Sequence, residues 1–325
     1  MSSRVFAGAA IAGKIALTAG LLWWLSTRVD IGDALSALGR FDPLVVAAGL
    51  VLALLQVGLA SWRFALVVRL CGARIGIGFA LRTTLVGGFF SQLLVTFISG
   101  DAIRAWLLSR RGLALGRALE AVLLDRVIGV IALTLLILVG FVQFLDLLPN
   151  ETLRASAILL LAAAWGAVLA FLLLGRAGSL CQTLLGRWPW LAGLASTGRH
   201  LFGDSRAAWL ALALGLAIHL LSVAIFILLF RGLGLPISPW LCLVVVPMVM
   251  LITMIPLSIA GWGLREGAMV VAFAGMDLPD SDILGASIAF GLMILAASLP
   301  GAALWLNSKR PHSISADVRP EAPGS

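Results

Sequence analysis

The stretch VIGVIALTLLILVGFVQFL, residues 127–145, decides the fold class, because none of its 19 residues is charged. A helix needs about 20 apolar residues to cross about 30 Å of hydrocarbon, so this run predicts a membrane-spanning helix. Four more charge-free runs predict spans at 43–62, 155–175, 207–230 and 283–308. We therefore expect a polytopic, all-α membrane protein.

The composition of the 325 residues agrees with this expectation. Apolar residues make up 61 % of the chain and charged residues 12 %, whereas soluble domains average about 45–50 % and about 25 %. Apolar residues run from end to end, so the sequence predicts no separate soluble catalytic domain. We expect a single transmembrane domain over residues 1–308 and a disordered cytoplasmic tail over 309–325, which is rich in proline, serine and charge.

Three further segments are apolar but irregular. The first, near residues 6–26, is expected to be a retained span. The run TTLVGGFFSQLLVTFISG at 83–100 is interrupted by glycines, and 232–264 contains four prolines, which break or kink helices. We expect 83–99 to enter the membrane and return to the same side. We expect 232–264 to hold one span and then a broken crossing that continues to about residue 276, which gives about eight crossings.

The basic residues orient these crossings. With both termini cytoplasmic, most of the 23 Lys and Arg residues fall on the cytoplasmic side, as the positive-inside rule requires. The rule also accounts for the net charge of +8 without a nucleic-acid partner, since no zinc-ligand spacing or basic-aromatic platform accompanies it. The three cysteines are far apart and form no CxxC pair, so they predict neither a disulfide framework nor a metal site.

Charged residues at membrane depth supply the candidate site. Ionisable side chains cost at least about 2.5–3.5 kcal/mol there, so they persist mainly where they are paired or line a cavity. Guanidinium groups bind phosphate, and carboxylates orient them or meet an amine. The pattern favours a site for the headgroup of an anionic or zwitterionic lipid; the alternative is a salt-bridge network that only holds helices together. The candidates are Asp101, Arg104, Asp125, Arg126, Arg265 and Glu266.

Small and helix-breaking residues flank two of these charged pairs. Gly100 precedes Arg104, and Pro256, Gly261 and Gly263 precede Glu266. We expect them to form the turns of the two broken segments, where backbone N–H groups and a helix N-terminus can face an anion.

Two other titratable residues are candidates for a proton relay. Glu120 lies one turn into its predicted span, and His219 lies in the middle of another. The structural alternatives are an ion pair of Glu120 with Arg117 and a hydrogen bond from His219 between helices. The chain has no Walker loop, HExxH, GxSxG or carboxylate metal cluster, so we expect no enzymatic activity, no metal and no cofactor.

Three motifs together carry a family resemblance. They are SGDAIRAWLLSR at 99–110, ALEAVLLDRVIG at 118–129 and IPLSIAGWGLREGA at 255–268. In order and spacing the chain resembles the lysylphosphatidylglycerol synthase/flippase-like transmembrane family over about residues 5–308. The resemblance implies an integral membrane protein that flips or otherwise handles lipids. No aminoacyltransferase domain accompanies it here, so lysyl transfer is not expected.

From the resemblance and the charged residues together we expect a lipid flippase or transporter in the bacterial inner membrane. Its partner would be a polar membrane lipid, with a homo-oligomer or a biosynthetic enzyme as further partners. The principal alternative is a non-catalytic accessory subunit of a glycolipid or hopanoid biosynthetic pathway. A small-solute transporter that uses the same arginines for an organic anion is a third reading.

Overall fold

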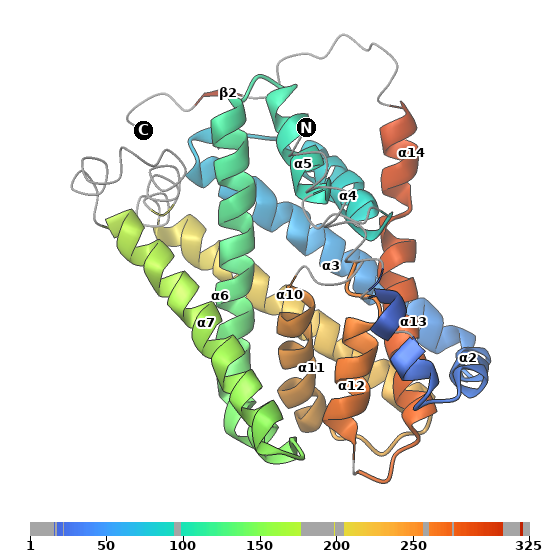
Figure 1. Ribbon diagram of the computed structural model, residues 1–325. Helices are drawn as coiled ribbons and strands as arrows, with labels where there is room; N and C mark the ends of the chain where they lie inside the picture. The colour runs from blue at the N-terminus through green and yellow to red at the C-terminus, as the bar shows by residue number, and fades with distance from the viewer. Residues whose placement is uncertain are drawn as a thin grey trace.

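The structure, a computed structural model, describes residues 16, 18–21, 23–93, 99–176, 198, 205–255, 260–274, 276–307 and 319–320. These residues form an all-α bundle (Figure 1). Its strands in the described part are β1 (Ala73–Arg74) and β2 (Arg319–Pro320), which pair antiparallel over two residues. Most of the predicted first span, and the predicted tail apart from β2, lie outside the described residues.

Five helical segments among the described residues are long and apolar enough to cross a membrane. They coincide with the five charge-free runs and confirm the helical membrane fold. The segments are α3 (Pro43–Leu70), α6 (Leu115–Leu147), α7 (Glu151–Arg176), α10 (Ser205–Gly232), and α13 (Asp280–Ser298) continued by α14 (Pro300–Asn307).

The boundaries of α3 follow from local chemistry. Asp42 accepts a hydrogen bond from the backbone N–H of Leu44 at 2.7 Å, and Pro43 occupies the first helical turn, as is typical of helix starts. The helix ends at Leu70, just before Gly72 with a φ of +75°. The structure thus extends α3 beyond residue 62, the predicted end of the span, and places Arg63 inside this helix.

The segment around the first predicted break consists of two helices, α4 (Ile77–Leu93) and α5 (Ser99–Ser109). They pack antiparallel, because Gly87 lies opposite Arg104 while Ser91 lies opposite Gly100. A Cβ on Gly100 would lie 3.1 Å from the Ser91 Cβ. Gly100 was predicted to form a turn; it lies instead in the first turn of α5, where its lack of a side chain permits this close contact.

The second irregular segment also holds two helices, α11 (Pro239–Thr253) and α12 (Leu264–Phe273). Ser238 caps α11 by accepting a hydrogen bond from the Leu241 N–H at 3.1 Å, and Pro247 lies inside the helix. In Figure 1, α4 and α5 lie in the upper part of the bundle, whereas α11 and α12 lie in the lower part.

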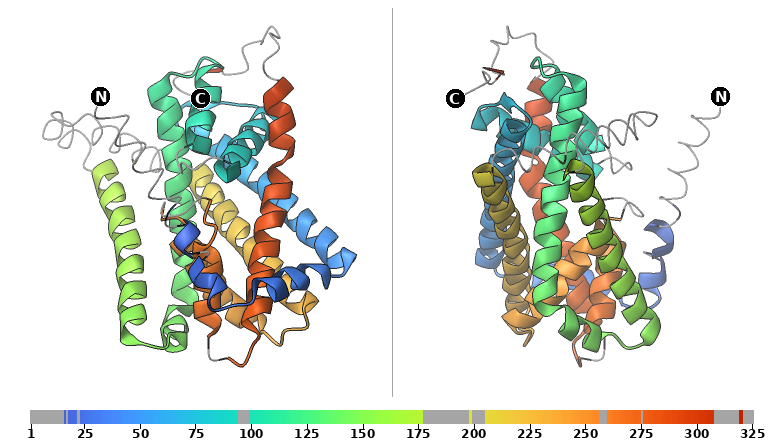
Figure 2. Two further views of the ribbon diagram at one scale, coloured as in Figure 1. Left: turned by 45° about the vertical axis from the view of Figure 1, so that its right-hand side comes forward. Right: turned by 90° about the vertical axis from the view of Figure 1, so that its left-hand side faces the viewer.

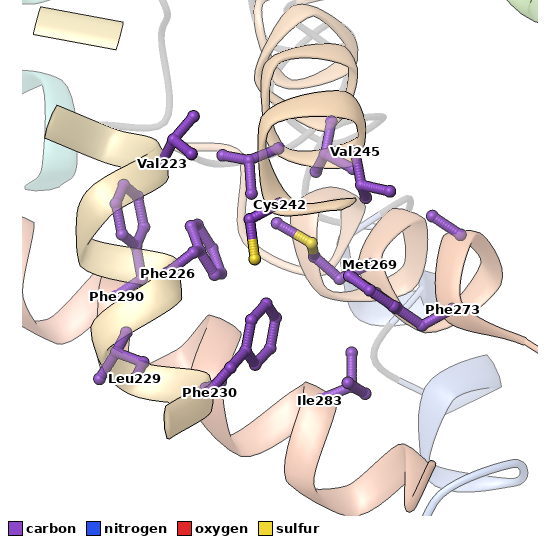
Figure 3. Packing of buried hydrophobic residues seen from close by; sticks show 14 of the residues in the cluster. Val223, Phe226, Leu229, Phe230, Cys242, Val245, Met269, Phe273, Ile283 and Phe290 are labelled. Carbon is purple, nitrogen blue, oxygen red and sulfur yellow. The ribbon is translucent and has the colours of Figure 1, made fainter. Parts of the chain in front are cut away.

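Aromatic packing joins the helices of the lower part. Figure 3 shows side chains of α10, α11, α12 and α13 meeting in one apolar cluster. The rings of Phe226 and Phe290 stack with centroids 4.6 Å apart, and Phe230 meets Phe273 edge-on at 5.4 Å. Such close van der Waals packing is the main attraction between helices in lipid, where hydrocarbon surrounds the protein on all sides.

The remaining helices lie at the periphery. Figure 2 shows α7 at one edge of the bundle, and it packs mainly against α6. A short helix, α2 (Ile31–Gly39), packs on α13, where Gly285 allows Ala37 to approach. Arg40, just after α2, pairs with Asp282 of α13. The first charged cluster lies on three other helices, α3, α5 and α6.

Candidate functional site

Five charged side chains from three helices form one alternating chain. Arg63 of α3 donates from Nε to Oδ1 of Asp125 at 2.9 Å, and Arg104 of α5 donates from Nη2 to Oδ2 of Asp125 at 2.8 Å. Arg104 also reaches Asp101 at 3.4 Å, and Arg126 donates to both Asp101 oxygens at 2.8 and 3.2 Å. The order is therefore Arg63, Asp125, Arg104, Asp101, Arg126, which we call the charge chain.

The charge chain is buried at one end and partly open at the other. The side chains of Arg63 and Arg104 are 12 % and 10 % exposed, whereas that of Arg126 is 37 % exposed. Asp125 is also buried, about 15 Å from the start of α6 at 1.5 Å per residue. The charge chain holds three guanidinium groups against two carboxylates, so its described members carry a net positive charge.

Small and aromatic neighbours position Arg104. A Cβ on Gly87 of α4 would lie 2.6 Å from the Arg104 Cγ, so a glycine there leaves the space for this side chain. The Arg104 guanidinium lies 4.0 Å from the ring centroid of Phe64, a favourable contact for a cation at low dielectric. Neighbouring positions on a helix point about 100° apart, which is why Asp125 and Arg126 reach different partners.

The second cluster joins α12 to α13. Arg265 donates to Oε1 of Glu266 from Nη2 at 2.5 Å and from Nε at 3.0 Å. Ser287 lies 3.2 Å from both side chains. The other Glu266 oxygen accepts the backbone N–H of Gly263 at 2.6 Å. A carboxylate of this chain thus occupies the N-terminus of α12, the position at which an external anion would bind.

This second cluster is more enclosed than the charge chain. The side chains of Arg265 and Glu266 are 8 % and 2 % exposed, and the Arg265 guanidinium lies near the rings of Trp262 and Phe290. A Cβ on Gly291 would overlap Arg265. No hydrogen bond or ion pair among the described residues joins this cluster to the charge chain. The six predicted charged residues therefore form two groups, not one.

The predicted turn and relay residues have distinct surroundings. Gly261 and Gly263 adopt φ values of +82° and +79° in the turn before α12, a conformation that favours glycine. Pro256 lies outside the described residues. His219 of α10 lies 3.1 Å from the Gly129 carbonyl of α6 through Nε2, so it bridges two helices.

Glu120 is half-buried on α6, near the Cys71 thiol. In the part of the chain that the structure describes, no three His, Cys, Asp or Glu side chains gather to hold a metal ion.

Arg63 and Ser287 are members of these clusters that the sequence reasoning missed. Arg63 directly follows the charge-free run 43–62, so it was expected beyond the end of the span, on the cytoplasmic side. One signal was available, because no proline or glycine lies between Leu59 and Cys71 to end the helix. Ser287 had no such signal, since its contact with Arg265 and Glu266 depends on how α13 packs on α12.

An apolar cavity of about 370 Å³ lies beside the bundle core. Side chains of α6, α7, α11 and α12 line it, including Phe144, Leu160, Met248 and Leu264. Phe144 is 18 residues beyond Arg126 on α6, or roughly 27 Å along the helix axis. The cavity and the open end of the charge chain therefore lie at different depths.

A comparison with family models matches residues 10–301 to the transmembrane region of lysylphosphatidylglycerol synthase. A search of the curated proteins finds no match. The matched residues include the whole charge chain, the second cluster, four of the five long helical segments and the fifth segment up to residue 301. The protein is therefore a multi-pass membrane protein that belongs to the family of the lysylphosphatidylglycerol synthase transmembrane region.

Proposed function

We propose that this protein binds the polar headgroup of a phospholipid or glycolipid at the Arg126 end of the charge chain and moves the lipid between leaflets. The observation that carries the proposal is the partly exposed Arg126 in a chain of ion pairs whose described members carry a net positive charge. A guanidinium group at this position can bind a phosphate through two parallel hydrogen bonds. The family assignment supports a lipid as the substrate class.

Within this proposal the five members of the charge chain have different roles. Arg126 contacts the headgroup. Asp101 orients Arg126 through two hydrogen bonds. Arg63 and Arg104 fix Asp125 from two helices, which keeps α5 in place on α6.

Two further features are consistent with a lipid path. The helices α4, α5, α11 and α12 are short. We propose that α4 and α5 enter the membrane and return to the same side, and that α11 is a span followed by a broken crossing that contains α12. Such discontinuous helices are typical of membrane proteins that bind polar ligands at depth. The apolar cavity of about 370 Å³ offers space for part of an acyl chain. We place both termini on the cytoplasmic side of a bacterial inner membrane on the basis of the arginine distribution.

The second cluster supports the alternative function, that of a non-catalytic accessory subunit. Arg265 and Glu266 are buried and paired with each other and with Ser287, as expected of a group that holds α12 against α13. If the charge chain has only this kind of role, the protein serves as an accessory subunit of a biosynthetic pathway. The role of Arg265 and Glu266 in headgroup binding stays a prediction.

The two functions separate in a reconstituted assay. The full-length protein is incorporated into phosphatidylcholine vesicles that contain fluorescent phosphatidylglycerol, and exchange between leaflets is followed by dithionite bleaching. We expect the wild-type protein to accelerate exchange and Arg126→Gln to reduce the rate at least about tenfold, because one charge-assisted bidentate contact is worth about 1.5–3 kcal/mol.

Arg154→Gln is the matched control. The Arg154 side chain is 38 % exposed and also pairs with a carboxylate, that of Glu151 at 3.0 Å. We expect it to exchange lipid at the wild-type rate. No acceleration by the wild-type protein, or equal rates for Arg126→Gln and the control, would contradict the proposal and favour the accessory role. Thermal unfolding in detergent shows that each variant is folded.

A further inference from the structure

A groove runs along the outer face of α3, and no member of the charge chain lines it. Its volume is about 640 Å³. Leu55, Leu59, Trp62 and Leu66 of α3 line most of its length, and Arg69 and Arg74 lie at one end. These helix positions recur every three or four residues, so they share one face of α3. The groove is therefore aliphatic along most of its length and cationic at its end.

The position of α3 leaves this face exposed. Only 17 % of the most apolar stretch of α3 is buried inside the protein, the lowest share among the five candidate spans in the described residues. The packing of α3 against α10 uses a flanking face, about 100° away from Leu55, where Gln56 donates to the Ile218 carbonyl and to Ser222. The groove thus opens toward the surrounding bilayer.

The length of the groove matches one leaflet of the membrane. Leu55 and Arg69 are 14 residues apart, which is roughly 21 Å along a helix. Half of a bilayer's hydrocarbon core is about 15 Å thick, so an acyl chain and the glycerol backbone fit between these residues. Trp62 is exposed, and its ring offers a flat surface to a lipid chain near the interface.

The polar end of the groove selects the headgroup. Arg69 lies in the last turn of α3, and Arg74 lies in β1, so a helix terminus and the strand after it bring the two side chains to one end of the groove. Pairing with β2 occupies the backbone of Arg74. Two guanidinium groups beside an aliphatic groove complement an amphiphile whose polar end is anionic.

We infer that the α3 groove binds an anionic glycerophospholipid of the surrounding leaflet, with its phosphate at Arg69 and Arg74 and an acyl chain along Leu55, Leu59 and Leu66. This site lies on the outer surface of α3, away from Arg126. It therefore predicts a tightly held boundary lipid, not a transported one.

The experiment counts bound lipids by native mass spectrometry. The full-length protein in detergent is titrated with phosphatidylglycerol, with phosphatidylcholine of the same chains, and with inorganic phosphate. We expect one phosphatidylglycerol to bind more tightly than phosphatidylcholine. Arg69→Gln or Arg74→Gln should weaken this binding about fivefold and the double variant roughly 30-fold, because each basic residue near a membrane surface contributes about 1 kcal/mol.

Gly58→Trp tests the aliphatic part of the groove. Gly58 lines the groove and a Cβ there meets no atom within 4 Å, so the new ring can occupy the groove without disturbing the core. We expect it to displace the bound phosphatidylglycerol. Gly166→Trp on α7 is the matched control, because Gly166 is also exposed in a spanning helix and its Cβ would also meet nothing. Arg126→Gln should retain the lipid.

Three results would overturn the inference. The first is equal phosphatidylglycerol binding by the wild type, the double arginine variant and Gly58→Trp. The second is competition by inorganic phosphate that Gly58→Trp leaves unchanged, which would indicate an anion site without a lipid chain. The third is a dimer that Gly58→Trp converts into a monomer, which would make the groove an interface between two copies of the protein.

Discussion

Arg63 and Asp125 are joined by a hydrogen-bonded ion pair, with 2.9 Å between Nε and Oδ1, although 62 residues separate them in the sequence. The pair connects α3 to α6, and Asp125 uses its second oxygen to hold Arg104 of α5. A single carboxylate thus organises three helices. The stability of this part of the bundle should therefore depend on Asp125 more than on other acidic residues of α6.

Removing the Asp125 charge should destabilise the protein strongly. Asp125→Asn leaves Arg63 and Arg104 buried beside a neutral amide, and loss of one partner from a buried ion pair costs about 3–5 kcal/mol. We expect a clear drop in the midpoint of thermal unfolding in detergent. Asp146→Asn, at an exposed position of the same helix, should leave the midpoint within experimental error, and equal effects of the two variants would exclude this role for Asp125.

Filling the space at Gly87 should displace Arg104. A Cβ there would lie 2.6 Å from the Arg104 Cγ and 2.8 Å from its Cδ, and overpacking typically costs about 1–3 kcal/mol. Gly87→Ala should therefore lower the unfolding midpoint and slow lipid exchange. Gly78→Ala in the same helix meets no atom within 4 Å, so it should be neutral or stabilise slightly. A neutral Gly87→Ala would mean that Arg104 has room to move.

His219 should act between helices and not as a proton relay. Its Nε2 lies 3.1 Å from the Gly129 carbonyl, and hydrogen bonds between membrane helices average about 0.6 kcal/mol. We expect His219→Ala to lower stability modestly and to leave the pH profile of lipid exchange unchanged between about pH 5.5 and pH 8. If lipid exchange depends on pH in the wild type and does not depend on pH in His219→Ala, the result would instead support the relay.

Cys71 should react slowly with maleimides. This residue follows α3 and is buried, and burial raises the pKa of its thiol to about 12, with a further rise from Glu120 and an opposing effect of Arg117. Roughly one molecule in ten thousand is then a thiolate at pH 8, and the thiolate is the reactive form. Mass spectrometry of the double variant Cys181→Ala, Cys242→Ala should show little maleimide labelling of the native protein. Labelling should become complete when denaturation exposes Cys71. Rapid labelling of the native protein would show that this end of α3 opens.

The charge-free runs were sufficient to predict the five long helices, because a helix in hydrocarbon must satisfy its own backbone hydrogen bonds and present apolar side chains. The same rule identified Asp101, Arg104, Asp125 and Arg126 as residues that need partners. The sequence did not predict that Gly100 lies inside α5, since a glycine after an apolar run indicates a turn and a close helix contact equally well.

The sequence by itself determined that this chain lies in a membrane, where its long helices run and that Asp101, Arg104, Asp125, Arg126, Arg265 and Glu266 need partners, because each of these properties depends on the composition of a local segment. The tertiary structure decided that Arg63 joins Asp125, that Arg265 and Glu266 pair with Ser287 in a separate cluster, and that Arg126 is the more exposed cation of the charge chain. Those outcomes depend on which helices become neighbours. A side chain's partner and exposure are properties of the packed bundle, and no spacing along one helix encodes them.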